Sequence, residues 1–88
     1  MKFEVLIKRS ALKVVMGLDK EYRERILEAV YMLKREPIPA RRYDVKKLRG
    51  YKDTYRIRVG RLRIVYEIKW LEKKILIHFV GWRGQAYK

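Results

Sequence analysis

The feature that most restricts the possible folds lies between residues 55 and 66, where apolar side chains recur at every second position on both sides of Gly60. A period of two is typical of a β-strand with one buried face. Glycine favours the first central position of a two-residue hairpin turn, so Gly60 and Arg61 are predicted to form that turn. The segment therefore predicts two antiparallel strands, at about Thr54–Val59 and Leu62–Lys69.

The predicted turn decides which basic side chains face one another. In this register Arg58 lies directly opposite Arg63, and Arg56 lies on the same face two residues along its strand. Like charges that face each other across an antiparallel pair are destabilising. The arrangement is easier to explain if a polyanion occupies this face, because a guanidinium group can hold a phosphate at two points.

The charge of the whole chain points to the same kind of partner. Lysine and arginine total 24 against 10 aspartate and glutamate residues, a formal net charge of +14, and ten of the basic residues fall between Arg41 and Arg63. This excess is far beyond what solubility requires, so nucleic acid is the leading candidate. An anionic membrane surface is less well supported, because the bases concentrate on predicted strands and a loop and not on an amphipathic helix.

Composition excludes several other classes of protein. No apolar run approaches the roughly 18 residues of a membrane span, and no signal peptide is recognisable, so a cytoplasmic protein without a membrane partner is expected. Cysteine is absent, which excludes disulfides, thiolate metal ligands and a cysteine nucleophile. No metal site and no cofactor are predicted. The absence of asparagine in a chain with 39% charged residues suggests adaptation to heat.

The 88 residues suffice for one compact core, so a single domain over residues 1–88 is expected. Ser10 is predicted to cap a short helix that ends at Gly17, and Asp19 to cap a second helix that ends near Glu36, before Pro37. The expected elements, in chain order, are a strand at Lys2–Lys8, a helix at Ala11–Met16, the helix that follows Asp19, and strands at Thr54–Val59, Leu62–Lys69 and Lys74–Val80.

This order predicts an α+β fold. An N-terminal strand and a two-helix hairpin precede a three-stranded antiparallel meander, and the helices pack on one face of the sheet. Tyr43–Lys52 is predicted to be a basic connection without a strand. Because the apolar strand residues must face the helices, the arginines are predicted to lie on the other, open face.

Four short segments in this order and spacing resemble one known group of proteins. They are Lys47-Leu48-Arg49-Gly50, Tyr55-Arg56-Ile57-Arg58-Val59, Leu62-Arg63-Ile64-Val65-Tyr66, and Val80-Gly81-Trp82-Arg83 followed by Tyr87. With the element order, they resemble the RelE/ParE toxin superfamily, and specifically its RelE branch of ribosome-dependent messenger RNA endonucleases. The resemblance covers nearly the whole chain. It implies a RelE-like microbial RNase fold and a toxin of a type II toxin–antitoxin system, which inhibits translation.

The resemblance also implies catalytic residues. In that family, basic residues of two neighbouring strands, an arginine after the last strand and a tyrosine near the C-terminus surround the scissile phosphate. Carried over one position at a time, they fall on Arg56, Arg58, Arg63, Arg83 and Tyr87. The best-studied members have lysines at the two positions that Arg56 and Arg58 occupy here.

The implied chemistry is cleavage of RNA by its own 2′-hydroxyl group, which leaves a cyclic phosphate and requires no metal ion. Arg58, Arg63 and Arg83 suit the stabilisation of charge on the phosphoryl oxygens. Arginine is a poor proton carrier because its pKa stays above about 12. Tyr87 is the better candidate for general base, since nearby cations would favour its phenolate.

Other residues are predicted to bind RNA or to support the structure without taking part in the reaction. A set of basic residues is expected to contact RNA backbone phosphates without sequence preference: Lys46, Lys47, Arg49, Lys52 and Arg61. His78 is interpreted as a structural histidine of the last strand. Trp82 and Tyr51 fit either stacking on RNA bases or covering the edge of the core, and the sequence does not separate these roles.

The sequence leaves alternatives for function. The chain is predicted to be a metal-independent endoribonuclease whose partners are the ribosome, messenger RNA and a RelB-like antitoxin, as the resemblance implies. One alternative is a ParE-like toxin that acts on DNA gyrase, although Arg83 and Tyr87 argue against that branch. The other is a non-catalytic module that binds RNA or the ribosome.

Overall fold

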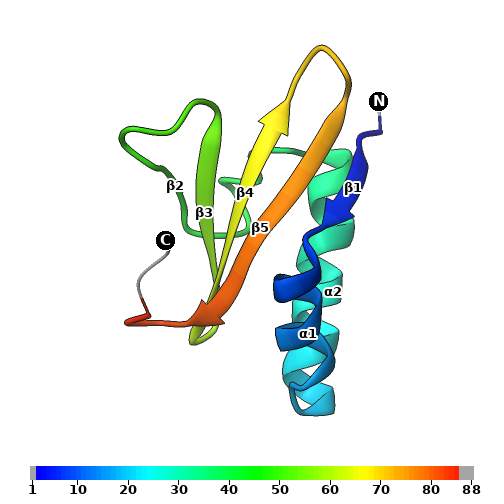
Figure 1. Ribbon diagram of the computed structural model, residues 1–88, viewed down its shortest axis with the longest axis vertical. Coiled ribbons are helices and arrows are strands. Elements are labelled where there is room, and N and C mark those ends of the chain that lie inside the picture. Colours follow the sequence, from blue (N-terminus) through cyan, green and yellow to red (C-terminus); the bar gives the residue numbers. More distant parts are fainter. Residues whose placement is uncertain (1, 86–88) are drawn as a thin grey trace.

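The structure is a computed structural model, and it describes residues 2–85. It contains two helices and five strands, in the order β1 (Glu4–Ile7), α1 (Arg9–Met16), α2 (Lys20–Arg35), β2 (Val45–Lys47), β3 (Thr54–Val59), β4 (Leu62–Lys69) and β5 (Lys74–Trp82). The helices lie together on one side of the sheet (Figure 1). The predicted α+β class, with helices on one face, is therefore confirmed.

The five strands form one mixed sheet in the order β1-β5-β4-β3-β2. The chain returns through α1 and α2 between β1 and the later strands, and β1 pairs with β5 in parallel. The remaining neighbours pair antiparallel, so β3, β4 and β5 form the predicted meander. The pairing of β4 with β5 shifts register between Val65 and Tyr66.

The core lies between the helices and one face of this sheet. On β3 and β4, alternate residues turn inward, including Ile57, Ile64 and Tyr66, which are fully buried. They pack with residues of the helix face such as Ile26 and Leu33. This apolar burial drives folding, and it turns the intervening residues of each strand to the face away from the helices. Thr54, Arg56 and Val65 are nevertheless buried on that face.

The predicted hairpin is confirmed residue by residue. Val59 pairs with Leu62, and Arg58 lies opposite Arg63. Gly60 has a φ of 62°, a value that glycine adopts without the steric cost of a side chain. The register that places two arginines face to face is therefore the one in the structure.

Three details of the sequence prediction are wrong. Ser10 does not cap α1, because that helix begins at Arg9 and Lys8 is its N-cap residue. The connection before β3 contains a strand, β2, which pairs with β3 through Lys46 opposite Arg56. The last strand continues to Trp82 and does not end at Val80, because Leu62 and Arg63 still offer pairing partners there. Among the described residues, no helix is long and apolar enough to cross a membrane.

Candidate functional site

Basic side chains from three successive segments line one hollow of about 490 Å³ on the open side of the sheet. We call it the basic hollow. Its lining residues are Lys46, Lys47, Leu48, Arg49, Arg56, Arg58 and Arg63. β2 and the turn after it supply the first four, β3 supplies Arg56 and Arg58, and β4 supplies Arg63. A hollow lined by six cationic side chains and one leucine is suited to a polyanion.

Arg56 is the least accessible cation of the basic hollow. Only 8% of the residue is exposed, and its Nη1 atom lies 3.3 Å from Oδ2 of Asp44. Burying a guanidinium group costs free energy unless the charge is paired. The Asp44 carboxylate supplies that pairing, so Arg56 is held in place at the back of the hollow.

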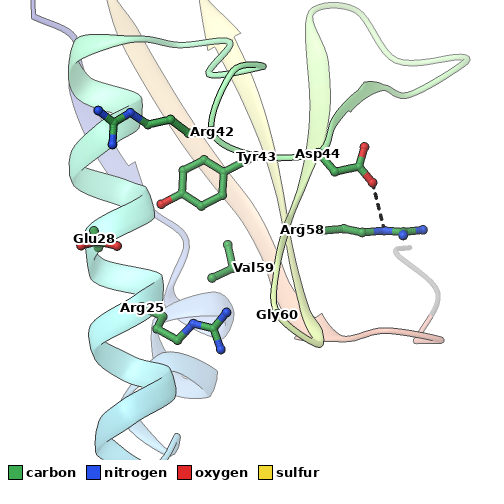
Figure 2. A pocket seen from close by; sticks show the side chains of 8 residues that line it. All are labelled: Arg25, Glu28, Arg42, Tyr43, Asp44, Arg58, Val59 and Gly60. Atoms are coloured by element: carbon green, nitrogen blue, oxygen red, sulfur yellow. Dashed lines mark ion pairs between the residues drawn. The ribbon is translucent and has the colours of Figure 1, made fainter.

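Arg58 extends further toward solvent, with 42% of its side chain exposed. Its Nε atom lies 3.5 Å from the same Oδ2 atom of Asp44, and its backbone N–H donates to the Asp44 carbonyl oxygen at 3.1 Å. Figure 2 shows the Asp44 and Arg58 side chains extending away from α2, whereas Arg42 and Tyr43 are directed toward that helix. The carboxylate therefore meets Arg58 on the open side and offsets part of its repulsion with Arg63.

Arg63 connects the hollow to the end of the described chain. Its Nη2 atom donates to the carbonyl oxygen of Gln85, and its Nε atom is buried without a hydrogen-bond partner among the described residues. Gln85 reaches this position by folding back over β5, where its Oε1 atom accepts from the backbone N–H of Trp82 at 2.7 Å. The segment after β5 thus reaches Arg63 from the adjacent strand.

The close approach of this segment depends on Gly81, which lies opposite Arg63 in the sheet. A Cβ atom at residue 81 would lie 2.4 Å from Cζ of Phe79 and 2.6 Å from Oε1 of Gln85. Both distances are shorter than real contacts allow. A larger residue at position 81 would therefore displace the Phe79 ring and the Gln85 side chain from the strand beside Arg63.

A second hollow, of about 280 Å³, lies between α2 and the β3–β4 hairpin (Figure 2). It is lined by Arg25, Glu28, Arg42, Tyr43, Asp44, Arg58, Val59 and Gly60. Burial, followed by the nearby Glu28 carboxylate, raises the pKa of the Tyr43 phenol. In this view the guanidinium groups of Arg25, Arg42 and Arg58 lie well apart, and that of Arg58 extends away from α2, so they do not converge on one ligand atom.

The predicted catalytic residues are placed as follows. Arg56, Arg58 and Arg63 share the basic hollow. Arg83 is exposed in the turn after β5, and its backbone N–H donates to the carbonyl oxygen of Arg61 at 2.7 Å. Arg83 does not line the hollow, and Tyr87 lies outside the described residues.

The residues predicted to contact RNA backbone divide into two groups. Lys46, Lys47 and Arg49 line the basic hollow with the three arginines. Lys52 instead lines a different hollow, beside Asp53 and the β4–β5 hairpin, and Arg61 is exposed at the hairpin turn. The structure therefore gathers three of these five residues.

Trp82 and His78 lie outside the basic hollow, and each contacts a side chain of another element. The Trp82 ring meets the Tyr22 ring of α2 edge-on, with centroids 5.3 Å apart, so it covers the edge of the core. The Nε2 atom of His78 lies 3.0 Å from Oε1 of Glu67, and this hydrogen bond is the main reason that the pKa of Glu67 is lowered.

Sequence reasoning missed Asp44 and Gln85 as neighbours of the arginines. Asp44 carried a signal, since it is one of only two acidic residues in the basic stretch from Arg41 to Arg63. An isolated carboxylate among cations is a natural counter-charge for those that become buried. Gln85 carried no comparable signal, because its contact with Arg63 depends on how the chain turns after β5.

Comparison with known proteins defines the class to which this fold and this site belong. The protein family described as ParE toxin of type II toxin-antitoxin system, parDE, matches residues 5–87. RelE1 of Methanocaldococcus jannaschii is 35% identical over 88 residues, which cover 100% of this chain and 98% of the relative. This chain therefore belongs to the RelE/ParE family of type II toxin–antitoxin toxins.

Solved structures agree with this assignment. The crystal structure of the archaeal RelE–RelB complex from Pyrococcus horikoshii OT3 contains a chain that is 36% identical and matches with a TM-score of 0.87, over 98% of this chain and 100% of that one. A chain in the RelB–RelE antitoxin–toxin complex from Methanococcus jannaschii is 26% identical, with a TM-score of 0.72 and 88% of each chain covered. The predicted resemblance to RelE toxins is confirmed.

Proposed function

We propose that this toxin is a ribosome-dependent endoribonuclease that cleaves messenger RNA and so inhibits translation. The observation that carries the proposal is the shared position of Arg56, Arg58 and Arg63 in one hollow on neighbouring strands. Three guanidinium groups in one concave site are suited to hold a phosphodiester and to stabilise additional negative charge on it.

The proposed reaction uses the RNA's own 2′-hydroxyl group as nucleophile. The 2′-oxygen attacks the adjacent phosphorus, its proton passes to a base, and the bond between phosphorus and the 5′-oxygen breaks. The leaving 5′-oxygen takes up a proton, and a 2′,3′-cyclic phosphate remains. The bond-making and bond-breaking steps call for charge stabilisation and proton transfer and for no metal ion or cofactor.

The chain's residues would divide these tasks. Arg58 and Arg63 face each other across β3 and β4, so a phosphate between them would be contacted from both strands. Arg83 lies outside the lining of the hollow and would contribute only if the bound RNA extends to the turn after β5. Tyr87 is proposed as the general base, because arginine holds its proton too tightly for that role. The orientation of RNA for in-line attack would come from the ribosome.

We also propose a RelB-like antitoxin as the partner that restrains this toxin. The Pyrococcus horikoshii and Methanococcus jannaschii relatives are described as RelE–RelB complexes. An acidic or amphipathic segment of the antitoxin would cover the basic surface and displace RNA.

The test is cleavage of messenger RNA in a ribosomal decoding site, mapped by primer extension. We expect the wild type to cut, and Arg63→Ala to cut about 10²- to 10³-fold more slowly, because it loses one preorganised charge-stabilising group. Tyr87→Phe should also lose most of the rate. Intact messenger RNA with wild-type toxin, together with retained ribosome binding, would instead identify a non-catalytic binding module.

A second candidate function is supported by the description of the matching family, which names the ParE toxin of parDE. A ParE-like toxin would act on DNA gyrase and not on RNA. A supercoiling assay separates the two candidates: we expect no inhibition of gyrase by this chain. Gyrase inhibition without messenger RNA cleavage would replace the first proposal by the second.

A further inference from the structure

Asp44 contacts both of the β3 arginines that line the basic hollow. Its Oδ2 atom lies 3.3 Å from Nη1 of Arg56 and 3.5 Å from Nε of Arg58. Its backbone carbonyl accepts from the N–H of Arg58 at 3.1 Å. One residue therefore touches two consecutive open-face arginines of β3 and also fixes the backbone of one of them.

These contacts are selective. Within residues 2–85, the ion pairs that involve arginine are the two with Asp44. Arg63, which lies opposite Arg58, is bound instead by the Gln85 carbonyl oxygen. The carboxylate thus restrains the β3 side of the facing arginine pair, and a different group restrains the β4 side.

The contact with Asp44 leaves part of the Arg58 guanidinium group free to bind a ligand. A guanidinium group has five N–H donors, and a phosphate is usually gripped by two of them in parallel. Asp44 lies nearest Nε of Arg58, the atom next to the aliphatic stem, so the two terminal nitrogens remain available to a ligand in the hollow. A guanidinium group that is already restrained loses less conformational entropy when it binds a phosphate, and it is already oriented when the transition state forms.

The Asp44 carboxylate also opposes the binding of RNA to the hollow. It places a negative charge beside the cations that attract RNA, and 56% of its side chain is exposed to solvent. We infer that Asp44 is a positioning residue that orients Arg56 and Arg58 toward the scissile phosphate and that weakens RNA binding in exchange for faster cleavage. This inference rests on the proposed endoribonuclease function.

The experiment compares Asp44→Asn with Asp53→Asn. Both changes raise the net charge by one, but Asp53 lies beside Lys52 and the β4–β5 hairpin and not in the basic hollow. Asp53 has a positive φ of 49°, which asparagine also tolerates, so the control substitution is compatible with its backbone. The Asp44 carbonyl that pairs with Arg58 is unchanged in Asp44→Asn.

We expect Asp44→Asn to lower kcat for ribosome-bound messenger RNA by about ten- to a hundredfold, the range associated with a misplaced catalytic group. Its affinity for a short single-stranded RNA should rise severalfold, because a competing carboxylate is lost. Asp53→Asn should leave kcat within twofold of the wild type. An unchanged kcat in Asp44→Asn, or equal gains of RNA affinity in both variants, would overturn the inference.

One further measurement covers the case in which the variant does not fold. If Asp44→Asn does not fold, NMR relaxation of the arginine side chains in the wild type replaces it: the Nε–H of Arg58 should be more restricted than that of Arg61, and equal mobility would overturn the inference. If the wild type does not cleave messenger RNA, the proposed function fails. The affinity comparison of the two variants still decides whether the Asp44 charge opposes RNA binding.

Discussion

At the scale of single residues, Tyr66 shows how one buried polar group joins distant parts of the chain. The residue is fully buried, and its hydroxyl group donates to the carbonyl oxygen of Pro37 at 2.7 Å. Its ring stacks on Tyr55, with centroids 6.0 Å apart. The hydrogen bond fixes Pro37, in the segment after α2, against β4. From Pro37 the chain continues to Asp44 and β2.

Burial, with a smaller contribution from Tyr55, raises the pKa of Tyr66 above its ordinary value. A raised folded-state pKa means that the unfolded chain loses this proton first, so the contribution to stability is complete below about pH 10 and declines as pH rises further. Tyr66→Phe should reduce the free energy of unfolding by about 1 kcal/mol at pH 7, through the lost hydrogen bond. It should also reduce the decline of stability above about pH 10.

Urea unfolding at pH 7 and at pH 10.5 tests both effects. Tyr55→Phe is the matched control, because Tyr55 is only partly buried. It should retain most of the wild-type decline at high pH. A Tyr66→Phe protein with the full wild-type decline would show that other groups, such as the lysines, account for the pH dependence.

At the scale of elements, β2 determines which basic residues of the long connection reach the site. Lys46 pairs opposite Arg56 and therefore shares its face of the sheet. Lys52 follows β2 and lines a different hollow, together with Asp53 and Glu67. Two lysines that looked equivalent in the sequence thus have different surroundings.

We expect Lys46→Ala to weaken binding of single-stranded RNA about three- to tenfold, through loss of about one phosphate contact. Lys52→Ala should change the dissociation constant less than twofold, although it removes the same charge. Fluorescence anisotropy with a labelled RNA, at one fixed salt concentration, gives both values. Equal losses in the two variants would mean that RNA follows the net charge of the molecule and not the basic hollow.

The same elements show how far sequence reasoning extends. The bounds of β3 and β4 agree with the prediction because Ile57, Val59, Leu62 and Ile64 alternate with basic residues and Gly60 fixes the turn. The grouping of the three arginines follows from that register. β2 could not be predicted from Val45–Lys47, because two of its three residues are lysines and its pairing depends on β3.

The contacts of the candidate site were less predictable than its arginines. Asp44 is separated from Arg56 along the chain and meets it only because the loop after Pro37 returns to the sheet edge. Gln85 meets Arg63 through its carbonyl oxygen after the chain turns beyond β5, while its side chain occupies the room that Gly81 leaves beside Phe79. Both are tertiary contacts between segments that have no common periodicity, so a pattern within one segment cannot reveal them.

At the scale of the whole molecule, a net charge of +14 does not by itself fix how strongly salt opposes RNA binding. The salt dependence reports the phosphates that are contacted, since each one releases condensed counterions. The basic hollow offers six cations, of which Asp44 partly neutralises Arg56 and Arg58. Basic residues elsewhere, such as those of α2, contribute little if RNA stays in the hollow.

We therefore expect about five phosphate contacts, and a plot of log Kd against log salt concentration with a slope of about 3.5 for single-stranded RNA. Titrations of a short labelled RNA between low and physiological salt measure this slope. Arg63→Ala should reduce it by about 0.7, the value for one contact. A wild-type slope well above 5 would mean that RNA also contacts the helix side of the molecule. A slope below 1 would place RNA outside the basic hollow, and the phosphate-binding role of its arginines would then have no support.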